Sequence, residues 1–93
     1  MKGNLLLNER NVLEVGMFAE IVVWRLPQAV RASDHSFKYR LALVVDGVCV
    51  LRFDNEAGKG DHKHVGSSEK PYKFCGPKTL LIDFWREVDK WRR

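Results

Sequence analysis

Apolar side chains recur along the first half of the chain with the two-residue period of β-strands. Residues 5–13 and 17–26 are rich in aliphatic, β-branched and aromatic residues, and Val15-Gly16 separates the two spans. This pattern predicts a first hairpin, because alternate residues of a strand point to opposite faces of its sheet. Both faces of 17–26 are apolar, which predicts a central strand that is covered on each side, with Trp24 in the core.

A second hairpin is predicted around Asp46-Gly47, a dipeptide typical of two-residue β-turns. Its strands would span residues 37–45 and 48–54. An uninterrupted ladder from this turn pairs Val45 with Val48 and Tyr39 with Asp54. That register places Tyr39, Arg52 and Asp54 on one face of the sheet, and Lys38, Arg40, Phe53 and Asn55 on the other.

The C-terminal part of the chain has a different period. From residue 78 to residue 92, apolar residues, Trp85 among them, recur at three- and four-residue intervals, which predicts a helix with one packed face. Gly76 and Pro77 suit the N-cap and the first helical position. The predicted fold class is α+β: an antiparallel sheet of four to five strands, made from two hairpins, packed by one C-terminal helix. The length of 93 residues predicts a single domain, residues 1–93.

Composition narrows the class of protein only a little. The formal net charge of +4 gives a mild attraction for polyanions. The longest wholly apolar run, residues 41–45, is far shorter than the ~20 residues that span a bilayer, and residues 5–7 are too short for a signal-peptide core. The sequence therefore predicts a cytoplasmic protein that does not enter membranes. Cys49 and Cys75 are too few for a disulfide framework and too far apart for a CxxC metal site.

Most of the chemically useful side chains fall in one stretch, residues 52–64, which reads RFDNEAGKGDHKH. His62 and His64 would point to the same side of an extended segment. The two histidines could be solvated loop residues or metal ligands, or they could carry acid–base chemistry. A metal site would need further ligands, and the remaining candidates Asp54, Glu56, Asp61 and His35 stand at no diagnostic spacing. We therefore expect no metal and no cofactor.

Acid–base chemistry on RNA suits two imidazoles at neutral pH. One imidazole would take the proton of a ribose 2′-hydroxyl, and the other would protonate the leaving 5′-oxygen. The extra negative charge of the phosphorane needs fixed cations, which Arg52, Arg40 and Lys59 could supply.

The neighbouring residues have both a binding and a structural interpretation. Gly58 and Gly60 would let backbone N–H groups approach a phosphate, although such a pair also occurs in ordinary loops. Tyr39 could stack on a base or pack within the sheet. Asp54 could orient a histidine or Arg52, or form only a strand-end ion pair.

The run from residue 24 to residue 64, together with Pro71-Tyr72 and the LIDFW segment of the predicted helix, resembles the TumE-type toxin family. The most specific part of the resemblance is the aromatic-Asp-Asn, glycine, His-x-His pattern of the second hairpin and the loop after it. The resemblance points to Tyr39, Arg40, Arg52, Asp54, Asn55, Gly58, His62 and His64. It implies a growth-inhibiting toxin of bacterial and archaeal toxin–antitoxin pairs, neutralised by a helix-turn-helix antitoxin encoded beside it.

Residue chemistry and resemblance together favour a toxin that is a metal-independent endoribonuclease acting on RNA. The predicted catalytic residues are His62, His64, Arg52 and Asp54. The predicted substrate-binding residues are Tyr39, Arg40, Asn55, Gly58, Lys59 and Gly60. Two alternatives stay open: a metal-dependent nuclease or other phosphoryl-transfer enzyme, and a non-enzymatic module that binds a protein or a nucleic acid. A homodimer is also left open.

Overall fold

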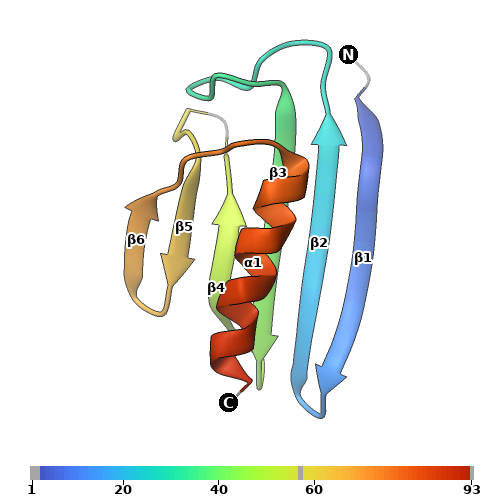
Figure 1. Ribbon diagram of the computed structural model, residues 1–93, viewed down its shortest axis with the longest axis vertical. Helices are drawn as coiled ribbons and strands as arrows, with labels where there is room; N and C mark the ends of the chain where they lie inside the picture. The colour runs from blue at the N-terminus through green and yellow to red at the C-terminus, as the bar shows by residue number, and fades with distance from the viewer. Residues whose placement is uncertain (1–2, 57, 93) are drawn as a thin grey trace.

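The computed structural model describes residues 3–56 and 58–92, which form one antiparallel sheet crossed by one helix (Figure 1). The strands lie side by side in chain order, β1-β2-β3-β4-β5-β6. Their bounds are Asn4–Glu14 (β1), Met17–Arg25 (β2), Phe37–Val45 (β3), Val48–Asp54 (β4), His62–Val65 (β5) and Ser68–Pro71 (β6), and α1 spans Pro77–Trp91. The predicted α+β class is confirmed, and both predicted hairpins are present.

The sheet has six strands rather than four to five, because β5 and β6 form a third hairpin. The sequences of these strands, HKHV and SEKP, lack apolar alternation. Short strands at a sheet edge need few apolar residues, so the hydrophobic pattern gave no signal for them. The turn between them contains Gly66, whose φ of 60° lies in the left-handed region.

The second hairpin has the predicted turn but a different register. Asp46 and Gly47 have φ values of 50° and 80°, as a two-residue hairpin turn requires, and Val45 pairs with Val48. The ladder then shifts: Val44 pairs with Cys49, and Leu43 pairs with Leu51. This bulge leaves one extra residue on β4, so every pairing beyond it moves by one.

The bulge changes which residues share a face. Arg40, rather than Tyr39, lies opposite Asp54. Arg40 therefore joins Arg52 and Asp54 on one face, and Tyr39 lies on the other face with Phe53. The face assignment from uninterrupted counting was wrong, because a one-residue shift reverses the side to which each later residue points.

The core lies between α1 and one face of the sheet. The helix begins as predicted, with Gly76 at the N-cap and a proline in its first turn, and it buries Leu80, Phe84 and Val88. These side chains pack on the strand residues that point toward the helix, among them Ile21, Val23, Tyr39, Leu41, Leu43, Leu51 and Phe53. Burying each large apolar side chain stabilises the fold by about 1.5–3 kcal/mol.

The opposite face of the sheet is open, since the described residues contain no second helix to cover it. The central place of β2 between β1 and β3 is confirmed. The prediction that both faces of β2 are covered, with Trp24 in the core, is wrong. Val22 is only half-buried, and Trp24 is 37% exposed. No helix among residues 3–56 and 58–92 is long and apolar enough to cross a membrane.

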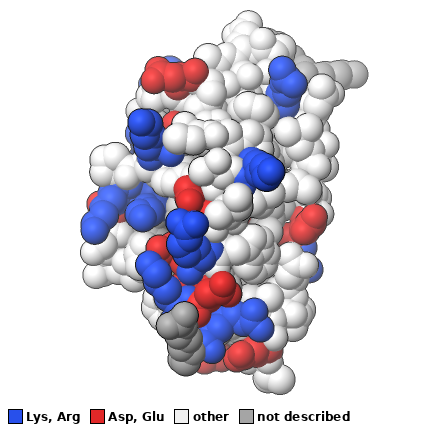
Figure 2. All heavy atoms as spheres, in the orientation of Figure 1, with Lys and Arg blue, Asp and Glu red and all other residues white. Residues whose placement is uncertain are grey.

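Charges on the helix side are mixed. Figure 2 shows Lys and Arg interleaved with Asp and Glu over α1 and the β5–β6 hairpin. Ion pairs such as Lys90–Glu87 and Arg86–Asp83 link neighbouring turns of α1. Pairs of this kind on a solvated helix contribute little to stability. The helix side therefore presents no field of a single sign to a polyanion.

Candidate active site

Strand pairing brings the two predicted histidines against β4. His62 lies opposite Asp54, and His64 lies opposite Arg52, so the four side chains share the open face. They alternate with residues such as Lys63 that point to the helix side. The structure thus brings together all four predicted catalytic residues. The edge hairpin, which was expected to be loop, is what holds the histidines in place.

The four side chains are in direct contact. The His62 Nε2 and Asp54 Oδ1 atoms are 2.6 Å apart, and the Arg52 Nε and Asp54 Oδ2 atoms are 3.1 Å apart. Arg52 Nη2 donates a hydrogen bond of 2.8 Å to His64 Nε2. The two imidazole rings lie edge to face, with centroids 5.0 Å apart. A group the size of a phosphate could therefore contact both rings.

The contacts of His62 determine where its protons lie. Its Nδ1 is 2.9 Å from the carbonyl oxygen of Gly60, which can only accept, so Nδ1 carries a hydrogen and donates it. His62 Nε2 lies 2.6 Å from Asp54 Oδ1, although the two atoms are not aligned as a hydrogen bond. A carboxylate this close attracts a proton on the imidazole. A protonated His62 could release that proton to a leaving group.

His64 has the complementary arrangement. Its Nε2 accepts from Arg52, so this nitrogen carries the lone pair and Nδ1 carries the hydrogen. The Nδ1 atom lies 3.6 Å from Glu69 Oε2, on β6. The side chain of His64 is 25% exposed, against 7% for His62. His64 is consequently the more accessible of the two imidazoles to an incoming substrate.

The same cluster also has the composition of a metal site. One ligand atom each from Asp54, His62 and His64 lies within 4.8 Å of the others. Asp54 Oδ1 and Arg52 Nε are buried, and neither makes a well-directed hydrogen bond, even though Oδ1 is close to His62 Nε2. An ion there would take up the free lone pair of Oδ1. It would also have to displace the Arg52 guanidinium, which already supplies positive charge beside Asp54 and His64.

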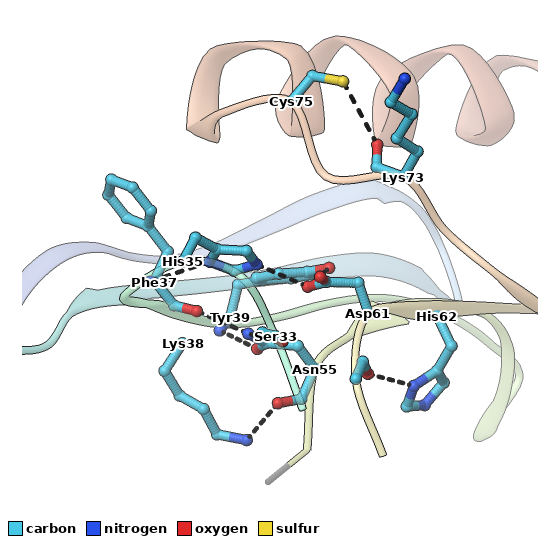
Figure 3. A network of polar contacts seen from close by, with 11 residues as sticks. Ser33, His35, Phe37, Lys38, Tyr39, Asn55, Asp61, His62, Lys73 and Cys75 are labelled. Carbon is cyan, nitrogen blue, oxygen red and sulfur yellow. Dashed lines mark hydrogen bonds and ion pairs between the residues drawn. The ribbon is translucent and has the colours of Figure 1, made fainter. Parts of the chain in front are cut away.

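A second network lies on the other side of the sheet (Figure 3). Asp61 Oδ1 accepts hydrogen bonds of 2.8 Å from the Tyr39 hydroxyl and from His35 Nε2. Phe74 stacks on the rings of both His35 and Tyr39. This network ties the 26–36 connector to the residue before His62. Sequence reasoning missed it because its members are scattered over 40 residues.

Tyr39 belongs to this buried network rather than to the open face; it is 1% exposed. Burial, and then the hydrogen bond to Asp61, raise the pKa of the Tyr39 phenol far above its ordinary value. A phenol whose pKa is raised by folding stabilises the protein fully below its unfolded pKa of about 10, and this contribution is lost as the pH rises above that value. We expect the free energy of unfolding, measured in urea, to fall above about pH 10. In Tyr39→Phe that fall should be shallower.

Asn55 is fully buried at the end of β4. Its Oδ1 accepts a hydrogen bond from Tyr39 N–H at 3.0 Å, and its Nδ2 donates to the Phe37 carbonyl at 2.6 Å. The side chain therefore continues the pairing of β3 and β4 where the backbone ladder stops. With its amide engaged in this way, Asn55 acts through the strand ends that position Asp54.

The glycine loop packs on the 26–36 connector. The N–H of Gly58 donates to the Arg31 carbonyl, and the N–H of Lys59 donates to the Glu56 carbonyl, both at 3.0 Å. These two groups are therefore already engaged and do not form an open phosphate cradle. The Lys59 side chain is 63% exposed, and its Nζ lies 3.6 Å from Glu56 Oε2. Of the predicted binding residues, Arg40 and Lys59 have exposed side chains.

Gly60 lies where a side chain would not fit. Its φ is +77°, and an added Cβ would lie 2.9 Å from the Ala32 carbonyl oxygen. We expect Gly60→Ala to lower the free energy of unfolding by about 1–3 kcal/mol, measured by urea denaturation. Gly66→Ala is the matched control, because its φ is +60° but nothing lies within 4 Å of the added Cβ. Equal losses in the two variants would refute a steric role for Gly60.

A family model described as Toxin TumE matches residues 2–92, nearly the whole chain. No curated protein and no solved structure matches significantly.

Proposed function

This chain belongs to the TumE toxin family, and we propose that it is a metal-independent endoribonuclease in which His64 and His62 exchange protons with RNA. Family membership makes it the toxin of a toxin–antitoxin pair and implies an antitoxin partner. The single observation that carries the proposed chemistry is the contact of Arg52 with both Asp54 and His64. It joins a phosphate-binding cation to an imidazole nitrogen and to the carboxylate that lies beside His62.

The reaction would begin when a phosphate attracts the Arg52 guanidinium. Arg52 binds phosphate in a bidentate manner, and its donation to His64 would then weaken. The His64 Nε2 lone pair that this frees would take the proton of the adjacent ribose 2′-hydroxyl. Substrate binding would thus prepare the base.

Bond exchange at phosphorus would follow. The 2′-oxygen forms a bond to phosphorus, the bond from phosphorus to the 5′-oxygen breaks, and the products are a 2′,3′-cyclic phosphate and a free 5′-hydroxyl. The leaving 5′-oxygen takes a proton from protonated His62, whose Nε2 lies beside Asp54. Arg52, assisted by Arg40 and Lys59, would offset the charge of the phosphorane. No water and no metal is needed for these steps.

The test is RNA cleavage by the purified protein in the presence of a chelator. We expect cleavage to persist, with cyclic phosphate ends on the products and no cleavage of an all-deoxy strand, which lacks the attacking hydroxyl. Intact RNA under conditions in which expression of the same protein arrests growth would refute the proposal.

A second candidate is a metal-dependent nuclease. It is favoured by the buried Oδ1 atom of Asp54, which has no hydrogen-bond partner among the described residues. In that case Asp54, His62 and His64 would hold a divalent ion that activates water. Activity abolished by the chelator and restored by one divalent metal would select this candidate. A 5′-phosphate end together with a 3′-hydroxyl end, in place of the cyclic product, would support it further.

A further inference from the structure

The open face of the sheet carries a groove beside the histidine cluster. It encloses about 390 Å³, and its lining includes Val22, Trp24, Lys38, Arg40, Arg52 and Asp54. Two of these residues, Arg52 and Asp54, belong to the proposed catalytic cluster. The groove is therefore continuous with the place where the reacting phosphate would lie.

An exposed tryptophan forms the far end of this groove. Trp24 is 37% exposed, on the sheet face that α1 does not cover. Its cross-strand neighbour is Lys38, and Val22 pairs with Arg40 on the same face. A flat apolar surface beside cations is the arrangement with which sheet proteins stack the bases of single-stranded nucleic acids.

The cations of the groove are available to a ligand. Arg40 is exposed and forms no ion pair among the described residues. Within the described part of the chain, the polar partner of Lys38 Nζ is a carbonyl oxygen, that of Asn55, at 3.3 Å. Both carboxylates that line the groove lie beside cations: Asp54 beside Arg52, and the exposed Glu56 with its Oε2 3.6 Å from Lys59 Nζ. The groove therefore favours an anionic, aromatic ligand.

We propose that this groove is a nucleotide subsite, in which a base of single-stranded RNA stacks on Trp24 and the adjoining phosphates contact Lys38 and Arg40. The inference rests on the proposed ribonuclease function and names how its substrate is held. Neighbouring strands are about 4.8 Å apart, so β2 lies about 10 Å from β4 and about 14 Å from β5. A strand of RNA that crosses the sheet would pass from Trp24 over Arg40 to Arg52 and His64.

A protein partner is the other class of ligand that uses exposed Trp and Arg residues. The observations favour RNA because the groove joins the catalytic cluster and because, among its described lining residues, those without an ion-pair partner are the cations Lys38 and Arg40. Base stacking also explains an exposed indole next to cations without requiring a complementary apolar partner. A protein docked here would cover Arg52.

Binding of a fluorescein-labelled, single-stranded 2′-O-methyl oligonucleotide, measured by anisotropy with chelator present, tests the subsite without cleavage. We expect Trp24→Ala to weaken binding by about 5- to 100-fold and Trp24→Phe to keep most of the affinity. Trp91→Ala is the matched control, because Trp91 is 39% exposed at the end of α1, and it should bind as wild type. Arg40→Ala should make the slope of the logarithm of the binding constant against the logarithm of the salt concentration less steep by about 0.7.

The outcomes separate the subsite from the proposed reaction. Unchanged oligonucleotide affinity in Trp24→Ala, in a wild type that cleaves RNA, overturns the subsite and leaves the ribonuclease standing. Loss of affinity in Trp24→Ala, in a wild type that cleaves nothing, supports the subsite and refutes the ribonuclease. If Trp24→Ala binds the oligonucleotide normally but no longer binds the protein encoded beside it, the groove is a protein-docking surface and the proposal is wrong.

Discussion

Changing His64 to glutamine is expected to lower the rate of RNA cleavage by about 10²- to 10⁴-fold, the usual effect of removing a general base. The amide cannot accept a proton at neutral pH, although it can still accept the hydrogen bond that Arg52 donates to His64. The fold should therefore be retained while the proton acceptor is lost. Single-turnover cleavage of a labelled RNA measures the rate, and growth after induced expression should recover in parallel.

Lys63→Gln is the matched control for this variant. Lys63 lies between the two histidines on β5, but its side chain points to the helix side, where its Nζ lies 5.9 Å from the Phe53 ring centroid. Cleavage by Lys63→Gln should stay close to that of wild type. A His64→Gln protein that is folded and still cleaves at the wild-type rate would remove His64 from the mechanism.

His62 should respond differently from His64. It is buried, and its ring contacts both Gly60 and Asp54, so its replacement should reduce stability as well as activity. The cleavage rates of the His62 and His64 variants should be compared at the same fraction of folded protein. This comparison separates the loss of a proton donor from the loss of stability.

The sequence was informative wherever a local rule determines the structure. The Asp46-Gly47 turn, the Gly76-Pro77 helix start and the first hairpin follow from turn chemistry and apolar period, and they appear as predicted. The β5–β6 hairpin could not be predicted in this way, since its strands are charged and depend on β4 for their pairing. These strands form because β5 pairs with β4, and not because their residues favour β-structure by themselves.

The site was predictable in its members but not in its geometry. A His-x-His pair places both rings on one side of any strand, so His62 and His64 were expected to lie together. Which residues of β2 and β3 share their face depended on the bulge in β4, which the residue types do not reveal. That bulge puts Arg52 and Asp54 on the same face as Arg40 and Trp24, and it leaves Tyr39 on the opposite, core-facing side. One inserted residue thus decided which side chains can meet a substrate.

Asn55→Ala is expected to lower the free energy of unfolding by about 2–4 kcal/mol, even though no apolar contact of the core is removed. The change leaves the N–H of Tyr39 and the carbonyl of Phe37 without their side-chain partner in a buried region. Each unsatisfied buried group costs about 1–3 kcal/mol. Because Asn55 adjoins Asp54, the variant should also cleave RNA more slowly, and urea denaturation and single-turnover rates measure the two effects.

Two further substitutions distinguish a positioning role of Asn55 from direct contact with substrate. Asn8→Ala, at an exposed position of β1, should change the free energy of unfolding by no more than about 0.5 kcal/mol. Asn55→Asp keeps an oxygen acceptor for Tyr39 N–H but places a buried carboxylate oxygen against the Phe37 carbonyl, which cannot donate, so it should be at least as destabilised as Asn55→Ala. A positioning residue requires activity to follow stability across this series. If Asn55→Ala were as stable as wild type and had only lost affinity for RNA, the amide would be a substrate contact.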